Sequence, residues 1–129
     1  PGRPTDGLVQ SIDIYPTLAK LCGLTPPKDI NGKIFLDLLN NPSLPGPEYA
    51  LSYNQSYGPP FRGQPRMYAV TLRSRVYRYI QWQKELAEGE ILFRELYDHR
   101  SDPDETNNLA AREPKVVKRF EKMLRERLD

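Results

Sequence analysis

The sequence predicts an α+β fold, in which a small antiparallel sheet of about four strands packs against a C-terminal helix and follows a helical lead-in. Apolar residues recur at helical spacing over residues 13–22 and again over residues 114–128. Between residues 49 and 98 the period changes to short runs of aromatic and β-branched residues, separated by glycine, proline or charged turns. We therefore expect a lead-in over 1–48 and a sheet-plus-helix subdomain over 49–129.

The first helix is expected in "SIDIYPTLAKLCGL", from about Asp13 to Cys22. Asp13 is the better N-cap, because it leaves Pro16 in the first turn, where its missing N–H needs no partner. Cys22 is expected to be a core residue on this helix, since free cysteine is commonly buried. A second, short helix in "INGKIFLDLLNN" is expected to bury Ile34, Phe35, Leu38 and Leu39.

The expected strands are "EYALSYN", "RMYAVTLRS", "VYRYIQWQ" and "FRELYD". Alternation in the third strand leaves open which face is buried. One face carries Val76, Arg78, Ile80 and Trp82, and the other carries Tyr77, Tyr79 and Gln81. We expect Arg73, Arg75 and Arg78 to lie along solvated strand edges, where positive charge discourages edge pairing.

The last helix is expected in "EPKVVKRFEKMLRERLD", with Pro114 at its first position. One apolar stripe runs along it, with charges on the opposite face. The stripe contains Val116, Val117, Phe120, Met123, Leu124 and Leu128. This helix is expected to cover one face of the sheet.

Composition excludes several classes of protein. The chain has 129 residues, which is enough to form the core of one domain. Its net charge of +2 argues against a nucleic-acid-binding protein of the overall-basic kind. A single cysteine excludes an internal disulfide and a multi-cysteine zinc site. No apolar run approaches the ~20 residues of a membrane helix. The start at Pro1, without methionine or a targeting segment, leads us to expect a piece of a longer protein.

The run "ELYDHRSDPDETNNLA", residues 95–110, gathers carboxylates around His99, the one histidine of the chain. An EF-hand loop would need glycine at its sixth position, where this run has Pro103. A zinc site would need more than one histidine, cysteine or converging carboxylate at defined spacing. We therefore favour a backbone corner over a metal or proton-transfer site.

The corner interpretation assigns a role to most of the run. Asp102 is expected to cap a helical turn, with Pro103 at its first position and Glu105 completing a capping box. Asn107 or Asn108 is then expected to adopt the left-handed conformation that ends the turn.

The same run, with "ELYD", "DP", "E" and "NLA" in order, resembles the closing signature of the sulfatase family in the alkaline-phosphatase superfamily. "SIDIYPTLAKLCGL", "INGKIFLDLL" and "VTLRSRVYRYIQW" are similar to further motifs of that family. The spacing of one set of residues is most similar to the iduronate-2-sulfatase branch. That set is Tyr68, Arg73, Tyr77, Arg78, Tyr79 and Trp82.

The resemblance implies a C-terminal subdomain whose helices over 1–48 dock on an α/β catalytic domain. In that family the catalytic domain binds calcium and carries a Cys-x-Pro/Ala-x-Arg motif that yields formylglycine. Cys22 is followed by "GLTP" and does not match the motif, so we expect no catalytic, cofactor-binding or metal-binding residue here and no activity of this chain alone. The resemblance also implies that the parent is secreted, periplasmic or lysosomal.

Residues 49–84 contain no Asp or Glu but many arginines and aromatic residues. Such a region suits a sulfated saccharide, since guanidinium groups bind sulfate oxygens and rings pack on sugars. The long segment "SYNQSYGPPFRGQPR" makes Tyr57, Arg62 and Arg66 the candidate substrate contacts. Two alternatives remain at this point: a stand-alone module that binds acidic polysaccharide, and the C-terminal part of a phosphate or phosphonate ester hydrolase.

Overall fold

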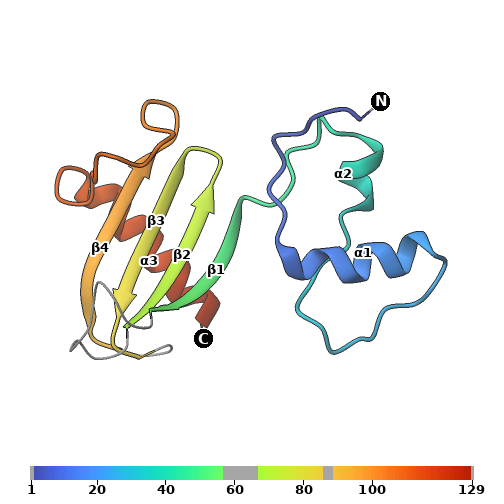
Figure 1. Ribbon diagram of the computed structural model, residues 1–129, viewed down its shortest axis with the longest axis horizontal. Helices are drawn as coiled ribbons and strands as arrows, with labels where there is room; N and C mark the ends of the chain where they lie inside the picture. The colour runs from blue at the N-terminus through green and yellow to red at the C-terminus, as the bar shows by residue number, and fades with distance from the viewer. Residues whose placement is uncertain (1, 57–66, 86–88, 129) are drawn as a thin grey trace. The chain divides into compact units, whose positions relative to one another are not determined.

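A computed structural model describes residues 2–56, 67–85 and 89–128, without the side chains of residues 56 and 128. The chain divides into two compact units, Pro1–Ala50 and Leu51–Asp129. The first unit contains η1 (Ser11–Asp13), α1 (Ile14–Leu21) and α2 (Leu36–Asn40). The sheet strands are β1 (Tyr49–Ser56), β2 (Met67–Ser74), β3 (Tyr77–Gln83) and β4 (Ile91–Asp98), and α3 (Pro114–Leu128) follows them (Figure 1). Among the described helices, none is long and apolar enough to cross a membrane.

The four strands form one sheet in the order β1-β2-β3-β4, and both β2 and β4 run antiparallel to β3. The register places Leu72, Tyr79 and Leu96 in one row across three strands. All three side chains are fully buried. The expected α+β fold is confirmed, and this row identifies the Tyr77, Tyr79 and Gln81 side of β3 as the face that α3 covers.

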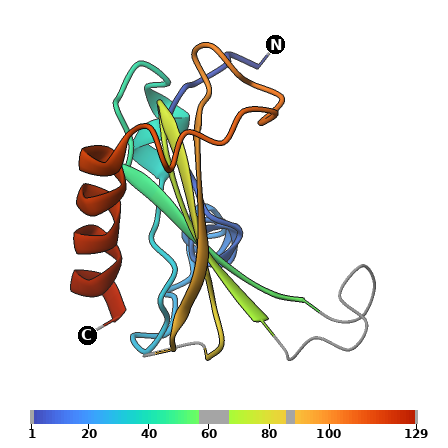
Figure 2. The same ribbon diagram turned by 90° about the vertical axis from the view of Figure 1, so that its left-hand side faces the viewer.

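The amphipathic stripe of α3 packs on that face, and Figure 2 shows the helix as a separate layer on one side of the sheet. Val117, Phe120 and Leu124 are buried there. The Phe120 ring lies 5.7 Å from the Tyr79 ring and 6.3 Å from the Tyr77 ring, centroid to centroid. Burying such aromatic and aliphatic side chains contributes about 1.5–3 kcal/mol each, so this contact adds substantially to the stability of the second unit.

The expectation of solvated edge arginines is wrong for Arg73 and Arg78. They lie on β2 and β3, the two interior strands, and are cross-strand partners. Like charges in that position repel each other. The repulsion is offset by acceptors: Arg78 Nη1 donates to Glu105 Oε2 at 2.7 Å, and Arg73 Nη1 donates to the Ser74 carbonyl at 2.6 Å. Sequence alternation could not show this, because Glu105 lies 27 residues away.

The first unit is organised around two buried polar side chains at the start of α1. Asp13 accepts hydrogen bonds from the backbone N–H of Gln10 at 2.9 Å and of Lys33 at 2.8 Å. Thr17 donates to the Asp13 carbonyl at 2.7 Å and accepts from the Phe35 N–H at 3.1 Å. These bonds fasten the segment before α2 to the first turn of α1. Asp13 does precede α1, as expected, but its carboxylate holds this segment rather than capping the helix.

The burial of α1 is the reverse of what its sequence predicts for a helix in a complete core. The side chains of Asp13, Pro16 and Thr17 are buried, whereas its large apolar side chains, Ile14, Leu18 and Leu21, are exposed. Cys22 is exposed as well, which contradicts its assignment to the core. In the following segment Leu38 is buried and Phe35 half-buried. Ile34 and Leu39 are exposed, so the expected burial of those two residues is wrong.

Candidate functional site

The candidate site is the second face of the sheet, opposite α3, together with the acidic corner that follows β4. Trp82 on β3 and Phe93 on β4 are cross-strand partners on this face, and their rings stack with centroids 5.3 Å apart. The next row along the strands carries Glu95, whose two oxygens are both engaged. Trp82 Nε1 donates to Glu95 Oε1 at 2.6 Å, and the Tyr97 hydroxyl donates to Glu95 Oε2 at 2.7 Å.

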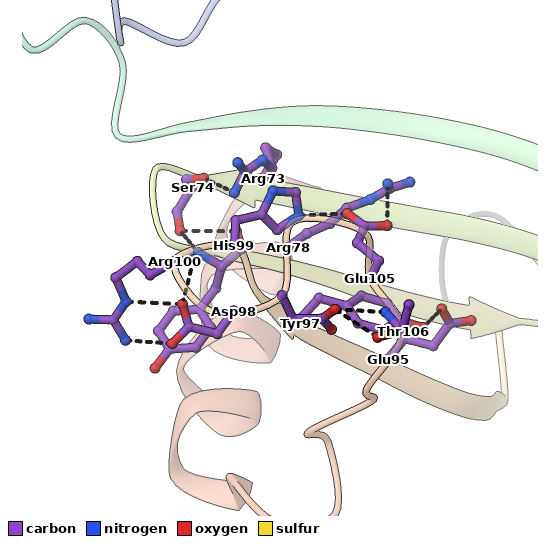
Figure 3. A network of polar contacts seen from close by, with 12 residues as sticks. Arg73, Ser74, Arg78, Glu95, Tyr97, Asp98, His99, Arg100, Glu105 and Thr106 are labelled. Carbon is purple, nitrogen blue, oxygen red and sulfur yellow. Dashed lines mark hydrogen bonds and ion pairs between the residues drawn. The ribbon is translucent and has the colours of Figure 1, made fainter.

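A second carboxylate, that of Glu105, lies where Arg78 and His99 meet (Figure 3). Arg78 Nη1 contacts Glu105 Oε2 at 2.7 Å, and His99 Nε2 contacts Glu105 Oε1 at 2.6 Å. Glu105 adopts φ +55°, a left-handed conformation that costs a non-glycine residue roughly 1–2 kcal/mol. The ion pair with Arg78 and the contact with His99 offset this cost. We call Arg78, His99 and Glu105 the carboxylate clamp.

The rest of the acidic run forms turns. Asp98 accepts two hydrogen bonds from the Arg100 guanidinium, at 3.0 and 2.5 Å, and one from the Arg100 N–H at 3.0 Å. Asp102 accepts from the Thr106 N–H, the Thr106 hydroxyl and the Asn107 N–H, at 2.9 to 3.0 Å. Asp102 therefore accepts backbone N–H groups with its side chain, as predicted for a capping residue.

Two details of the predicted corner are wrong. No helix begins at Asp102, so Glu105 completes no capping box. The left-handed residue of the corner is Glu105 and not Asn107 or Asn108. The physical reason is the carboxylate clamp. The contacts of Glu105 with Arg78 and His99 stabilise a left-handed backbone conformation that the local sequence disfavours.

Asn108 has a role that sequence reasoning missed. Its side-chain oxygen accepts from the Leu96 N–H at 3.0 Å, and its side-chain amide donates to the Arg94 carbonyl at 3.0 Å. The Leu109 N–H donates to the Leu96 carbonyl at 2.8 Å. The loop thus satisfies backbone groups along the outer edge of β4, much as a further strand would. An asparagine following an acidic turn was the signal for this, since asparagine can both donate and accept.

The electrostatics of the site do not suit proton transfer. Burial raises the pKa of the Glu105 carboxyl, but the hydrogen bonds from Arg78 and His99 outweigh this and hold the pKa below its usual range. Burial and the hydrogen bond to Glu95 raise the pKa of Tyr97 to about 12, so its hydroxyl stays a neutral donor. A general base needs a free lone pair and a pKa near the working pH. The geometry instead supports a structural role for both carboxylates.

The candidate substrate contacts from the sequence, Tyr57, Arg62 and Arg66, lie outside the described residues. Within the residues that are described, no group of three or more His, Cys, Asp or Glu side chains is placed to hold a metal ion. Asp98, His99 and Asp102, which the acidic run brings close in sequence, are each directed to separate protein partners.

The clamp makes the stability of the second unit depend on pH. Because folding holds the pKa of Glu105 below its ordinary value of 4.5, the unfolded chain binds more protons just below that pH. The free energy of unfolding should therefore fall as the pH drops through this range. In the variant Glu105→Gln, we expect the free energy of unfolding to fall less over the same pH range. Urea titrations between about pH 3 and pH 7, followed by the fluorescence of Trp82, the one tryptophan, measure this. Equal slopes in the parent chain and the variant would contradict this, and Glu113→Gln, at an exposed position, is the control.

Comparison with known proteins shows to which family this chain belongs. The family model "N-sulphoglucosamine sulphohydrolase, C-terminal" matches residues 1–129, the whole chain. The chain therefore belongs to this C-terminal family of the sulfatases, and the resemblance seen in the motifs is confirmed at that level.

The curated relatives are much longer than this chain. Arylsulfatase K of Xenopus laevis is 28% identical over 100% of this chain and 24% of its own length. Arylsulfatase K of Mus musculus is 30% identical over 92% of this chain and 21% of its own length. The chain thus spans about a quarter or less of these relatives.

Solved structures share the fold. A structure from Bacteroides thetaiotaomicron assigned to the sulfatases has 25% identity and a TM-score of 0.67, covering 88% of this chain and 23% of that one. A second, solved with its substrate D-glucosamine-2-N,6-O-disulfate, has 23% identity and a TM-score of 0.59, covering 90% of this chain and 24% of that one. At this identity the second match supports the fold alone.

Proposed function

We propose that this chain is the C-terminal part of a sulfatase that hydrolyses sulfate esters of a sulfated saccharide. Its first unit docks on an N-terminal catalytic domain, and its second unit supplies a rigid wall beside the substrate. The observation that carries the class of this proposal is the family match over residues 1–129. The exposed apolar side chains of α1 support the docking, because such side chains mark an interaction face.

The exposed stripe of α1 has the spacing of a docking face. Ile14, Leu18 and Leu21 lie at positions i, i+4 and i+7, and they are 49%, 55% and 58% exposed. Covering a leucine or isoleucine side chain completely contributes about 1.5–3 kcal/mol, so three of them make a substantial contact. Contiguous apolar surface of this kind marks interaction sites in soluble proteins. A preceding catalytic domain, as in the longer relatives, is the partner that fits.

The family's calcium and formylglycine belong, in this proposal, to that catalytic domain. The side chains of this chain do not fit them: its one cysteine is followed by "GLTP", and both carboxylates of the second face are saturated by protein donors. The contribution of the chain is therefore shape and positive charge rather than a reactive group.

The substrate contacts we propose are Tyr57, Arg62 and Arg66. They belong to residues 49–84, a stretch without Asp or Glu, so no acidic side chain of that stretch can pair with the two arginines. Replacing Arg62 and Arg66 together by alanine in the parent enzyme should raise KM about tenfold or more with a smaller change in kcat, since a charge-assisted hydrogen bond contributes about 1.5–3 kcal/mol.

Steady-state kinetics on a sulfated disaccharide check this prediction. Arg112→Ala, at an exposed position before α3, is the matched control and should leave KM unchanged. A parallel loss in the control, or an unchanged KM in the double variant, would remove these arginines from the substrate site.

Within the sulfatases, one set of residues has the spacing that leads us to propose the iduronate-2-sulfatase branch: Tyr68, Arg73, Tyr77, Arg78, Tyr79 and Trp82. Assaying the parent enzyme on a panel of sulfated saccharides tests both the class and the branch. We expect turnover, with preference for a 2-sulfated iduronate; preference for another sugar would reject the branch, and no turnover on any sulfate ester would reject the class. The whole-chain family match does not favour a stand-alone polysaccharide module or a phosphate or phosphonate ester hydrolase.

A further inference from the structure

Helix α3 carries a surplus of positive charge. Residues 114–128 contain six Lys or Arg and two Glu, a net charge of +4, whereas the whole chain has +2. The remainder of the chain is therefore net negative, at −2. This surplus on α3 is separate from that of the stretch 49–84, which holds six Lys or Arg and no acidic residue.

Five of the six basic side chains lie on one face of that helix. The buried stripe of Val117, Phe120 and Leu124 points to the sheet, and exposed cations occupy the opposite side. At 3.6 residues per turn these cations form one continuous stripe about 15 Å long, from residue 115 to residue 125. The basic stripe consists of Lys115, Lys118, Arg119, Lys122 and Arg125. Figure 2 shows α3 as a layer on one side of the sheet, so the strands lie against the opposite face of the helix from this stripe.

An ordinary solvated helix face alternates charges that attract each other at i, i+4. Here Lys115 and Arg119, and likewise Lys118 and Lys122, place like charges at that spacing. Each such pair destabilises a helix by about 0.2–0.5 kcal/mol. Over the described residues of the stripe, the salt bridge present is Lys122 with Glu126, at 3.7 Å. The sequence thus keeps a repulsive arrangement that a bound anion would relieve.

We propose that the basic stripe binds a sulfated polysaccharide chain, as a contact additional to the ester that is hydrolysed. This inference rests on the proposed function for its choice of polyanion. Lys and Arg donate strong charge-assisted hydrogen bonds to sulfate oxygens, and a row of them matches a repeating anionic chain. A membrane surface fits less well, because a helix that binds bilayers exposes an apolar face, and the apolar face of α3 is buried against the sheet.

Binding of the full-length enzyme to long heparin chains tests the proposal. Lys118→Glu/Lys122→Glu should weaken binding roughly tenfold at about 0.05 M salt, and the neutral pair Lys118→Gln/Lys122→Gln should weaken it less. Lys28→Glu/Lys33→Glu makes the same change in net charge at exposed positions of the first unit and should retain most of the affinity. Turnover of a small aryl sulfate should be unchanged in all variants.

Two results would overturn the proposal: an equal loss in the Lys28/Lys33 control, or unchanged heparin binding in both α3 variants. Tighter binding of a DNA duplex, or of phosphatidylserine vesicles, than of heparin at matched charge would also overturn it, because the stripe would then serve another class of partner. A failure of the proposed function can be distinguished from a failure of this inference. In that case the unmodified enzyme would not hydrolyse the aryl sulfate, whatever its affinity for heparin.

Discussion

Replacing Phe120 by alanine should lower the free energy of unfolding of the second unit by about 3–5 kcal/mol. The Phe120 ring is fully buried and contacts both Tyr77 and Tyr79, so its removal leaves a cavity between α3 and the sheet. A cavity under the single covering helix cannot be filled by a neighbouring element without shifting α3. Urea unfolding followed by Trp82 fluorescence measures the loss.

Two further variants make this prediction specific. Phe120→Leu keeps most of the apolar volume and should lose much less stability. Lys118→Ala, on the exposed face of the same helix, should change stability by no more than about 0.5 kcal/mol. If Phe120→Ala were as stable as Lys118→Ala, the packing of α3 on the Leu72, Tyr79 and Leu96 row would be wrong.

Replacing Asp13 by alanine should open the first unit locally. The backbone N–H groups of Gln10 and Lys33 would lose their acceptor, the buried Asp13 carboxylate, in a partly buried place, at a cost of about 1–3 kcal/mol for each donor. Protection of the Lys33 amide from hydrogen exchange should therefore fall about 30-fold or more, because exchange reports the free energy of local opening.

Asp13→Asn and Asp29→Ala serve as controls for that measurement. Asp13→Asn keeps one side-chain oxygen as an acceptor and should show an intermediate loss of protection. Asp29→Ala, at an exposed loop position, should leave the Lys33 amide as protected as before. Unchanged protection in Asp13→Ala would show that the carboxylate does not hold this segment.

The sheet and the last helix could be predicted from sequence because local pattern and tertiary position agree there. Period-2 runs with β-branched and aromatic residues form β1 to β4, and Pro114 begins α3 as its fixed φ favours. The choice of buried face on β3 could not be made, because Ile80 and Tyr79 are both buried although they lie on opposite faces.

The errors fall where distant contacts outweigh local preference. Glu105 takes the left-handed conformation that its own sequence disfavours, because Arg78 on β3 and His99 hold its carboxylate. The exposure of Cys22 could not be predicted either, since an apolar helical stripe indicates burial without showing whether the covering partner belongs to the same chain. The predicted site residues Tyr57, Arg62 and Arg66 stay predictions.

The central claim is that this chain is scaffold and interface, and that the reactive centre of the sulfatase lies in the preceding domain. The most direct test is the hydrolysis of an aryl sulfate by this purified chain with calcium present. We predict no turnover above the uncatalysed rate, since the one cysteine does not match the formylglycine motif and protein donors already engage the carboxylates of Glu95 and Glu105. Turnover above that rate would contradict the account.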